Sequence, residues 1–450
     1  MTPSPATWTV ATAPGRLPLI GHALKLRKGL LAFVSSLPAH GDLVRIQIGP
    51  WWAYVICDPD LTRQVLFDDR TFDKGGPLFD EGRRILGNGV LTCPHEDHRR
   101  QRRLLQPAFH RARMPAYAQV MSEQTAELLD GWHGGTVIDV PAHMHTLVSR
   151  ILARSLFASD SVGPASTLVE ESLATILHAM YVRLLMPSSL TRLPTPGNRR
   201  YQQALDRIHT AVDHAVQDYR SSGEEHADLV SELLAARDEA GRPLSDTEIH
   251  DQILTMLAAG IETTATTLSW ALYMLARHPD VEERLHAEVD TVLGGRTATW
   301  ADLPRLGLTE RIITETLRLY PPTWMLTRTV TADTRLGGQL LPAGATVVYS
   351  PYLIHTRADL FHEPGRFHPD RWRADNTARP PRHASIPFGA GSRKCIGDSF
   401  AMTAATLSLA GIASRWRLAL PSGRHVRPAA TAALRPHKLR MRATRRGPAV

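Results

Sequence analysis

The chain has 450 residues, 43% of them hydrophobic, and a formal net charge of +8. This content supports a sizeable core. No Ser/Gly linker, charge block or fixed-period repeat divides the sequence, so one domain spanning residues 1–450 is predicted, with residues 1–13 flexible. Because the basic residues are spread along the chain, a nucleic-acid-binding role is excluded, and the basic surface is either simply solvated or attractive to an acidic protein partner.

The amino terminus and the cysteines bear on the cellular compartment. The first residues contain no apolar run of about 18, so neither a membrane anchor nor a signal peptide is predicted. Cys57, Cys93 and Cys395 are odd in number and lack zinc-type spacing, which argues against a disulfide framework. A cytoplasmic protein is predicted, and a monomer is expected.

β-like segments come first in the chain. Runs at 43–48 and 53–56 alternate in polarity on either side of Gly49-Pro50 and predict a hairpin. A short helix is expected at 58–67. Residues 70–92 are rich in Gly and Asp and are interpreted as a long loop, and loops of that length tend to be functional.

Helical patterns dominate from about residue 96 to 300. Ser245 and Glu248 have capping-box spacing and predict the start of a long helix that ends near Arg277. The sequence as a whole predicts a mainly α fold with small β-sheets, of the α+β class. Further expected elements are helices at 281–292 and 309–320, β segments at 326–330 and 336–348, a helix after residue 397 and a β-like tail.

One cysteine stands in a glycine-lined loop, Phe388–Gly397, directly before an Ala/Leu-rich helical run. The glycines let backbone N–H groups approach the sulfur, and the start of the following helix favours negative charge. Both effects are expected to lower the pKa of the Cys395 thiol and to favour the thiolate, a good metal ligand. For the cysteine taken alone, a buried structural role beside a turn is the simpler interpretation.

The complete pattern F-x-x-G-x-R-x-C-x-G in this loop resembles the haem-binding loop of the cytochrome P-450 family of haem-thiolate monooxygenases. The order of elements is also similar to the P-450 fold over essentially the whole chain. The resemblance implies that Cys395 is the axial ligand of a haem b iron, held between the long helix and the helix after the loop. Phe388, Gly389, Arg393 and Gly397 are then haem-binding residues.

Glu315 and Arg318 lie three residues apart and so share one face of a helix, where they could be no more than an exposed ion pair. Their place before Pro321-Pro322 resembles the E-x-x-R element of the family. The segment 367–372 resembles a second element, whose arginine, Arg371, joins the pair. The resemblance implies a buried structural network that locks the loop holding Cys395 and is costly to break.

The middle of the long helix reads Ala259-Gly260-Ile261-Glu262-Thr263, in which a glycine and an acid interrupt an apolar stretch. A local kink with a surface-facing glutamate is the simpler explanation. The segment nevertheless resembles the oxygen-binding groove of the family. The resemblance implies that Ala259 and Gly260 adjoin the haem, and that Thr263 and Glu262 are catalytic and supply protons for cleavage of the O–O bond.

Haem propionates require cations, and four basic residues match family positions: His98, Arg102, Arg328 and Arg393. His98 and Arg102 have i,i+4 spacing on one predicted helix, followed by Gln106-Pro107-Ala108-Phe109, as in the family. Arg99, Arg100 and Arg103 fall on other faces of this helix. They are either solvated or available to an acidic ferredoxin.

By analogy, an apolar substrate pocket is expected between the long helix, the loop 77–91 and the residues after Pro321-Pro322, with Leu177–Met186 as its lid. Core packing is an equal alternative for each side chain. A compact, hydrocarbon-like substrate is predicted. The expected lining residues are Phe79, Ala258, Ala259, Thr263, Trp324, Met325 and Leu326.

The resemblance implies a monooxygenase that inserts one atom of O₂ into an unactivated C–H bond. Its electrons come from NAD(P)H through a separate ferredoxin and ferredoxin reductase, because the chain shows no flavin or iron–sulfur domain of its own. Residues 17–22, 321–330 and 347–355 resemble bacterial P-450s of terpenoid biosynthesis, which points to a sesquiterpene-like substrate in the making of a secondary metabolite or antibiotic. A macrolide, polyketide or fatty-acid hydroxylase is an alternative. A non-catalytic haem-thiolate sensor is another, against which the Glu262-Thr263 pair counts.

Overall fold

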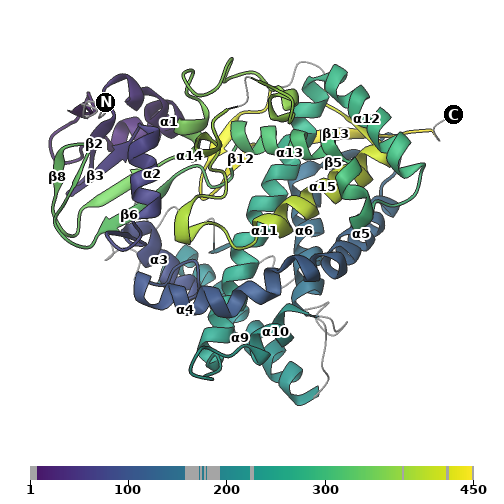
Figure 1. Cartoon of the computed structure of the whole chain (residues 1–450), viewed down its shortest axis with the longest axis horizontal. Helices are drawn as coiled ribbons and strands as arrows, with labels where there is room; N and C mark the ends of the chain where they lie inside the picture. The colour runs from purple at the N-terminus through teal and green to yellow at the C-terminus, as the bar shows by residue number, and fades with distance from the viewer. Residues whose placement is uncertain are drawn as a thin grey trace.

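A six-stranded sheet lies at one end of the molecule, and helices build the larger remainder (Figure 1). The structure, a computed structural model, describes residues 8–157, 193–222, 228–377, 380–421 and 425–447, together with residues 172, 175, 176 and 179. The two chain ends lie on opposite sides of the molecule (Figure 1). The mainly α fold with small sheets predicted from the sequence is confirmed.

The large sheet has the strand order β1-β2-β3-β9-β6-β4. β2 and β3 form the predicted hairpin, in which Leu43 lies opposite Ile56. β1 pairs in parallel with β2, so residues 10–12 belong to the sheet, whereas the sequence predicts flexibility through residue 13. The strands are β1 (Val10–Thr12), β2 (Leu43–Ile48), β3 (Trp51–Ile56), β4 (Phe72–Asp73), β6 (Leu326–Val330) and β9 (Thr346–Tyr349).

Smaller sheets stand apart from the large one. The strand order of the first is β10-β13-β5, and in the others β7 pairs with β8 and β11 with β12. Their bounds are β5 (Val137–Asp139), β7 (Thr334–Leu336), β8 (Gln339–Leu341), β10 (Trp416–Ala419), β11 (Pro428–Ala430), β12 (Leu434–Pro436) and β13 (Arg440–Arg445).

The central helix is α11 (Asp246–Arg277), which runs through the middle of the helical part (Figure 1). It starts at the predicted capping box: the Glu248 N–H donates to Ser245 Oγ at 3.2 Å, and the Ser245 N–H donates to the Glu248 carboxylate at 2.8 Å. α11 packs along α6 (Val140–Leu156) and also contacts α13 (Gly307–Leu319) and α15 (Asp398–Arg415).

The other helices surround this group. Within the described residues, every helix is too short or too polar to cross a lipid bilayer. The α-helices are α1 (Ala23–Ser36), α2 (Pro59–Phe67), α3 (Pro77–Leu86), α4 (His95–Leu105), α5 (Met114–Asp130), α9 (Pro196–Ser222), α10 (Leu229–Ala235), α12 (Pro279–Leu293) and α14 (Pro351–His355). Short 3₁₀ helices are η1 (Leu37–Ala39), η2 (Gln106–Phe109), η3 (Arg111–Arg113), η5 (Trp300–Arg305), η6 (Pro369–Trp372), η7 (Arg382–Ala384) and η8 (Gly391–Arg393).

The interpretation of residues 70–92 as one long loop is wrong. The segment contains β4 and the helix α3, which begins after Gly76 and ends at Gly87. Phe79, Ile85 and Leu86 of α3 are buried, and Ile85 and Leu86 pack into the main core, so the helix forms by burying apolar side chains. The glycines and aspartates that suggest a loop stand largely at its ends.

Helices α6 and α11 approach each other closely at Gly260. A Cβ atom on Gly260 would stand 2.6 Å from Leu152 Cδ1 of α6, so a side chain there would force Leu152 to move. Gly260 therefore has a packing role within the protein in addition to the haem contact implied by the sequence. Further along α11, the buried Trp270 stacks on Tyr320 with ring centroids 3.8 Å apart.

The cysteine loop passes directly over the end of α2. Gly391 has φ +69°, and a Cβ atom on it would lie 2.2 Å from the carbonyl oxygen of Leu66. Gly389 has a similar φ of +71° but open space around the Cβ position. Substituting Gly389 would therefore add backbone strain alone, whereas substituting Gly391 would add both backbone strain and a steric clash.

Gly391→Ala is expected to lower the free energy of unfolding by about 3 kcal/mol, because the substitution adds a backbone clash to left-handed strain. Gly389→Ala should cost only the strain, about 1 to 2 kcal/mol. Urea unfolding followed by circular dichroism measures both. Equal losses in the two variants would contradict the close contact with Leu66.

Candidate functional site

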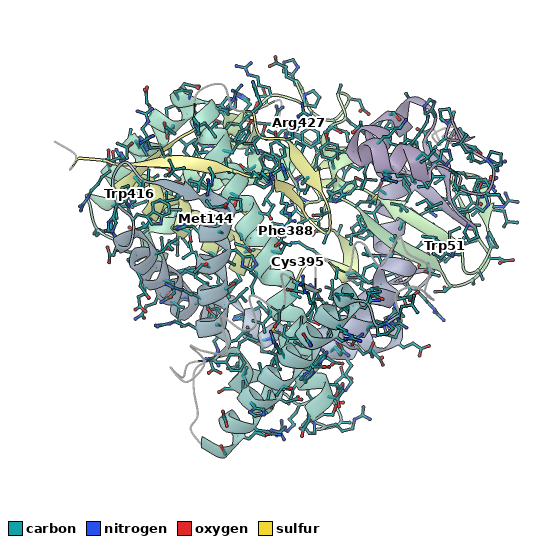
Figure 2. The ribbon with its side chains drawn as sticks, turned by 180° about the vertical axis from the view of Figure 1, so that it is seen from behind. Trp51, Met144, Phe388, Cys395, Trp416 and Arg427 are labelled. Carbon is teal, nitrogen blue, oxygen red and sulfur yellow. The ribbon has the colours of Figure 1, made fainter. Side chains whose placement is uncertain are left out.

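The loop that carries Cys395 leads from η7 through η8 into α15. The Cys395 N–H donates to the carbonyl of Phe388 at 2.9 Å, and the Gly389 N–H donates to the carbonyl of Ile386 at 3.0 Å. Phe388 and Cys395 lie close together near the centre of the molecule (Figure 2). The loop is thus a closed backbone turn that presents one sulfur at the start of α15.

The expectation of a lowered pKa for the Cys395 thiol is wrong for the protein alone. The residue is accessible to solvent, yet protein surrounds the thiol closely enough that burial raises its pKa. A hydrogen bond from the backbone of Gly397 and the positive charges of Lys74 and Arg102 act in the opposite direction but do not prevail. Thiolate formation here therefore depends on bonding to a metal, which deprotonates a coordinating thiol outright.

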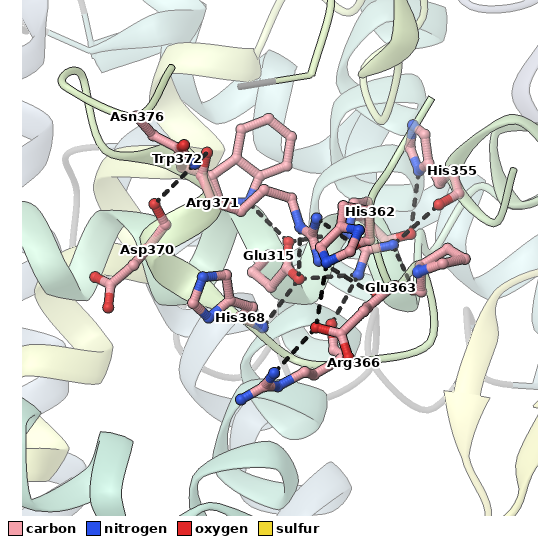
Figure 3. A network of polar contacts seen from close by, with 12 residues as sticks. Glu315, His355, His362, Glu363, Arg366, His368, Asp370, Arg371, Trp372 and Asn376 are labelled. Atoms are coloured by element: carbon pink, nitrogen blue, oxygen red, sulfur yellow. Dashed lines mark hydrogen bonds and ion pairs between the residues drawn. The ribbon is translucent and has the colours of Figure 1, made fainter. Parts of the chain in front are cut away.

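A buried charged network holds the region that precedes this loop (Figure 3). Glu315 and Arg318 are both fully buried and joined by two hydrogen bonds of 2.9 Å, from Nε and Nη2 of the guanidinium. Arg371 Nε approaches the same carboxylate at 3.4 Å. The structure therefore brings together Glu315, Arg318 and Arg371, the network implied by the sequence.

The network is larger than the sequence indicates. Glu315 also accepts hydrogen bonds from Trp372 Nε1 at 2.8 Å and from the His368 N–H at 3.1 Å. The guanidiniums donate to carbonyls of the segment 355–366: Arg318 to His355, Pro364 and Arg366, and Arg371 to His362. Arg318 of α13 and Arg371 of η6 thereby fix a long irregular segment.

His355 extends the network to the cysteine loop, a role that sequence reasoning missed. Its Nε2 accepts the Ile386 N–H at 2.9 Å, so Nδ1 carries the proton and donates to the Arg318 carbonyl at 3.2 Å. Burial first and the charge of Arg318 second lower the pKa of His355 to about 3, so its ring is neutral. The sequence offered one weak signal for His355, its position at the end of the 347–355 segment. The chain contains many other histidines, so this signal did not single it out.

The candidate catalytic residues lie within unbroken helix in α11. Thr263 Oγ1 donates to the carbonyl of Ala259 at 2.8 Å, and Thr267 Oγ1 repeats this contact with Thr263 at 2.9 Å. Glu262 is partly exposed. Burial lowers the pKa of His145 on α6, while the nearby Glu262 carboxylate acts in the opposite direction. His145 is thus a neighbour of Glu262 that the sequence did not single out.

The predicted propionate ligands differ in the hydrogen bonds and ion pairs that they already make within the protein. Arg393 is committed to protein partners: Nη2 lies 2.7 Å from Asp73, Nε 3.3 Å from Asp69, and Nη1 donates to the carbonyl of Cys93. Arg102 donates to the carbonyl of Lys394 at 2.6 Å and so ties α4 to the cysteine loop. Burial, reinforced by nearby cations, lowers the pKa of His98 to about 3, so the ring can donate a hydrogen bond but brings no charge.

Two of the three arginines proposed to meet an acidic partner are already neutralised. Arg100 pairs with Asp238 at 2.9 Å and with Glu248, and Arg103 pairs with Glu239. Arg99 is exposed.

Two buried cations near the cysteine loop have no carboxylate partner within the described part of the chain: Lys74, 8% exposed, and Arg328, 2% exposed. Among the described residues, Arg328 Nε has no hydrogen-bond partner, and Lys74 Nζ lies 5.1 Å from the centroid of the Phe79 ring. Asp73 pairs with Thr329 across β4 and β6, so the register places Lys74 opposite Arg328. Like charges in such positions repel.

This pair of unbalanced cations fits the two propionates of a haem beside Cys395. Burial first, then Arg328 and Arg393, holds the pKa of Lys74 well below its usual range, and an anion is what would stabilise the charged form. Sequence reasoning missed Lys74. The available signal was its rarity: it is one of 5 lysines, at positions 25, 28, 74, 394 and 438, among 52 basic residues.

The expected pocket residues are distributed between core and partly exposed positions. Phe79 and Trp324 are buried, and Trp324 Nε1 donates to the carbonyl of Thr431 at 3.1 Å within a cluster on the sheet side of the molecule. Met325 and Leu326 are partly buried against the same sheet. Ala258 and Ala259 are partly exposed on α11. Of the predicted lid Leu177–Met186, all residues but Ala179 lie outside the described residues.

His355 makes the stability of the fold dependent on pH. Because its pKa is about 3 in the folded chain and near 6.5 once unfolded, its contribution is complete above about pH 6.5 and is lost as the pH falls toward 3. His355→Gln, which does not titrate, should reduce the slope of unfolding free energy against pH by about 1.4 kcal/mol per unit between pH 6 and 4. The exposed His362→Gln serves as the control in urea unfolding; an unchanged slope in His355→Gln would refute the neutral ring.

Comparisons with known proteins identify the family. The family model described as Cytochrome P-450 matches residues 12–441. A solved structure, the cytochrome P450DA haem domain, superimposes with a TM-score of 0.89 at 27% identity, covering 98% of this chain and 99% of its own.

Curated relatives match over almost their whole length. Pentalenene oxygenase of Streptomyces avermitilis is 47% identical, covering 98% of this chain and 99% of its own. Cyclooctatin synthase of Streptomyces melanosporofaciens is 46% identical, covering 97% and 96%. Cyclooctat-9-en-7-ol 5-monooxygenase of the same species is 46% identical, covering 92% and 91%. The chain therefore belongs to the cytochrome P-450 family of haem-thiolate monooxygenases.

Proposed function

We propose that this monooxygenase hydroxylates an unactivated C–H bond of a polycyclic terpenoid during the biosynthesis of a secondary metabolite. The observation that carries the proposal is the 46–47% identity, over nearly the whole chain, to three oxygenases and synthases named for pentalenene and cyclooctatin-type terpenoids. The apolar character of the α11 face at Ala258 and Ala259 suits such a substrate. These relatives favour a terpenoid over a macrolide, polyketide or fatty acid.

The residues that would hold the haem come from separate elements. Cys395 would supply the thiolate, with Phe388, Gly389 and Gly397 shaping the loop around it. Lys74 and Arg328 would balance the propionates, together with Arg102, a neutral His98 and Arg393, which Asp73 already pairs. When bound, the haem activates O₂ for insertion of one oxygen atom into the substrate.

Proton delivery falls to α11. The Thr263 hydroxyl holds its proton toward the Ala259 carbonyl, one turn back along the helix, and can turn that proton to an acceptor in the site. Glu262, partly exposed beside His145, connects this position with solvent. The pair would thus pass protons from solvent to the site, with Thr263 as the positioned donor that general acid catalysis requires.

Electrons would reach the protein from NAD(P)H through a ferredoxin and its reductase. The cytoplasmic location and the monomeric state stay predictions from the sequence. Since Arg100 and Arg103 are already paired, and Lys394 pairs with Asp398 at 2.5 Å, the exposed Arg99 is the better candidate for contact with an acidic ferredoxin. The test of the function is NADPH-dependent product formation with a ferredoxin pair and a panel of sesquiterpenes, diterpenes, macrolides and fatty acids. Turnover confined to the macrolides or fatty acids would refute the terpenoid assignment.

Thr263→Ala is expected to lower the product formed per NADPH consumed by at least about tenfold, with release of peroxide, because the relay loses its hydroxyl. Thr267→Ala is the matched control, since its hydroxyl makes the same contact one turn further along α11. Product and peroxide are quantified against NADPH in both variants. Unchanged coupling in Thr263→Ala would remove this residue from the mechanism.

Lys74→Met is expected to raise the rate of haem transfer to apomyoglobin about tenfold, because one charged hydrogen bond to a propionate is lost. The reduction potential should also become more negative, since a cation near the haem is removed. The exposed Lys28→Met provides the control. A transfer rate and potential equal to those of the unmodified protein would exclude Lys74 from the propionate site.

A further inference from the structure

A pair of histidines joins α9 to the first part of α11, away from the haem residues. The rings of His209 and His250 stack with centroids 5.0 Å apart and an interplanar angle of 13°. His209 Nδ1 and His250 Nε2 are 3.3 Å apart, within hydrogen-bonding distance. Both residues are partly buried.

Acidic groups surround this pair on both helices. His250 Nε2 lies 3.5 Å from Asp213 of α9, and His250 Nδ1 lies 3.5 Å from the buried Asp251 of α11. Asp206 of α9 also acts on His209. The hydrogen bond to Asp251 is the largest effect that raises the pKa of His250, whereas burial and then His250 lower the pKa of His209. The first proton that the pair takes up therefore goes to His250.

Asp251 in turn holds the backbone between α3 and α4. Asp251 Oδ2 accepts the Asn88 N–H at 2.7 Å. A Cβ atom on Gly87 would lie 2.1 Å from Asp251 Oδ1, so the backbone fits here only because residue 87 has no side chain. The Asn88 side chain reaches Asp97 of α4 at 3.0 Å.

Neighbouring contacts continue this attachment. The Val90 N–H donates to Gln252 Oε1 at 3.0 Å, and Gln252 donates to Gln101 of α4 at 3.0 Å. Gly89 lies against Thr255, one turn before Ala258 and Ala259. Residues 87–90 thus form a strip fixed to α11 at the edge of the proposed substrate pocket.

We propose that His250 is a positioning residue for the substrate: its proton clamps α9 to α11 and holds Asp251 in place against residues 87–90, so that the pocket wall loosens when the proton leaves. The proposal rests on the proposed function for its substrate. Below the raised pKa of His250, the imidazolium bonds Asp213 and Asp251 together. As the pH rises through that pKa, one ring nitrogen becomes an acceptor facing a carboxylate, and the ion pair that joins the two helices through Asp213 is lost.

Hydrogen exchange on the substrate-free holoenzyme tests the clamp directly. After correction for intrinsic rates, protection of the Asn88 and Val90 amides should fall about fivefold between pH 6 and 8.5, the effect of losing one partly buried ion pair. In His250→Gln the dependence of protection on pH should be absent. His214 is an exposed histidine of α9, and in the control variant His214→Gln the dependence should be unchanged.

Two further variants guard against a merely structural effect of His250→Gln. His209→Gln removes the neighbouring ring, whose contact raises the pKa of His250, and should move the midpoint of the fall in protection to lower pH. Asp213→Asn removes an exposed carboxylate that also raises this pKa and should move the midpoint in the same direction. A midpoint that does not move to lower pH in these two variants, or a pH dependence that persists in His250→Gln, would overturn the proposal.

Binding of pentalenene as a hydrocarbon probe, followed by the low-to-high-spin change of the haem, gives the functional readout. Its affinity should fall about fivefold over the same pH range in the unmodified enzyme and in His214→Gln, but not in His250→Gln. An affinity that does not follow the exchange of residues 87–90 would also overturn the proposal. Failure of pentalenene to bind at any pH would count against the proposed substrate alone, because the exchange experiment contains none.

Discussion

The position of Cys395 depends on keeping one ionised carboxylate, that of Glu315, in the protein interior. A buried carboxylate is tolerated only when donors replace water, since the desolvation of an unpaired ion costs several kcal/mol. Glu315 receives such donors from both guanidiniums, an indole and a backbone amide, and each comes from a segment that must be in place for the others to fit. The network therefore specifies one arrangement of the irregular segment after α14, a stretch with few hydrogen bonds of regular structure.

From this carboxylate, a series of short contacts leads to the sulfur. Arg318 holds the carbonyl of His355, the neutral ring of His355 holds Ile386, and Ile386 closes the turn through Gly389. A second attachment comes from the opposite side, where Arg102 of α4 binds the carbonyl of Lys394. Cys395 is thus fixed from two directions by groups that do not touch its sulfur, which is how rigid supporting contacts hold a metal ligand.

The sequence predicted the elements that have local signals and missed those that depend on tertiary contacts. The capping box at Ser245 and the motif around Cys395 can be read from neighbouring residues, and the structure has both. The helix α3 was missed because its glycine-rich ends outweigh a short apolar face. Lys74 and His355 were missed for another reason: the role of each follows from burial and from partners far along the chain, and neither leaves a pattern in nearby sequence.

Two kinds of buried charge distinguish the scaffold from the site. Around Glu315 every charged group has partners within the protein: the carboxylate faces two guanidiniums, and backbone carbonyls accept their remaining N–H groups, so the result is rigid support. Lys74 and Arg328 are buried without a counterion among the described residues. Lys74 directly follows β4 and Arg328 lies on β6, and these strands pair through Phe72–Val330 and Asp73–Thr329. Their mutual repulsion opposes this pairing until an anion arrives. A ligand that binds only the folded chain stabilises it by mass action. Haem binding should therefore stabilise the pairing of β4 with β6 directly. This part of the fold would reach its full stability only with the cofactor bound.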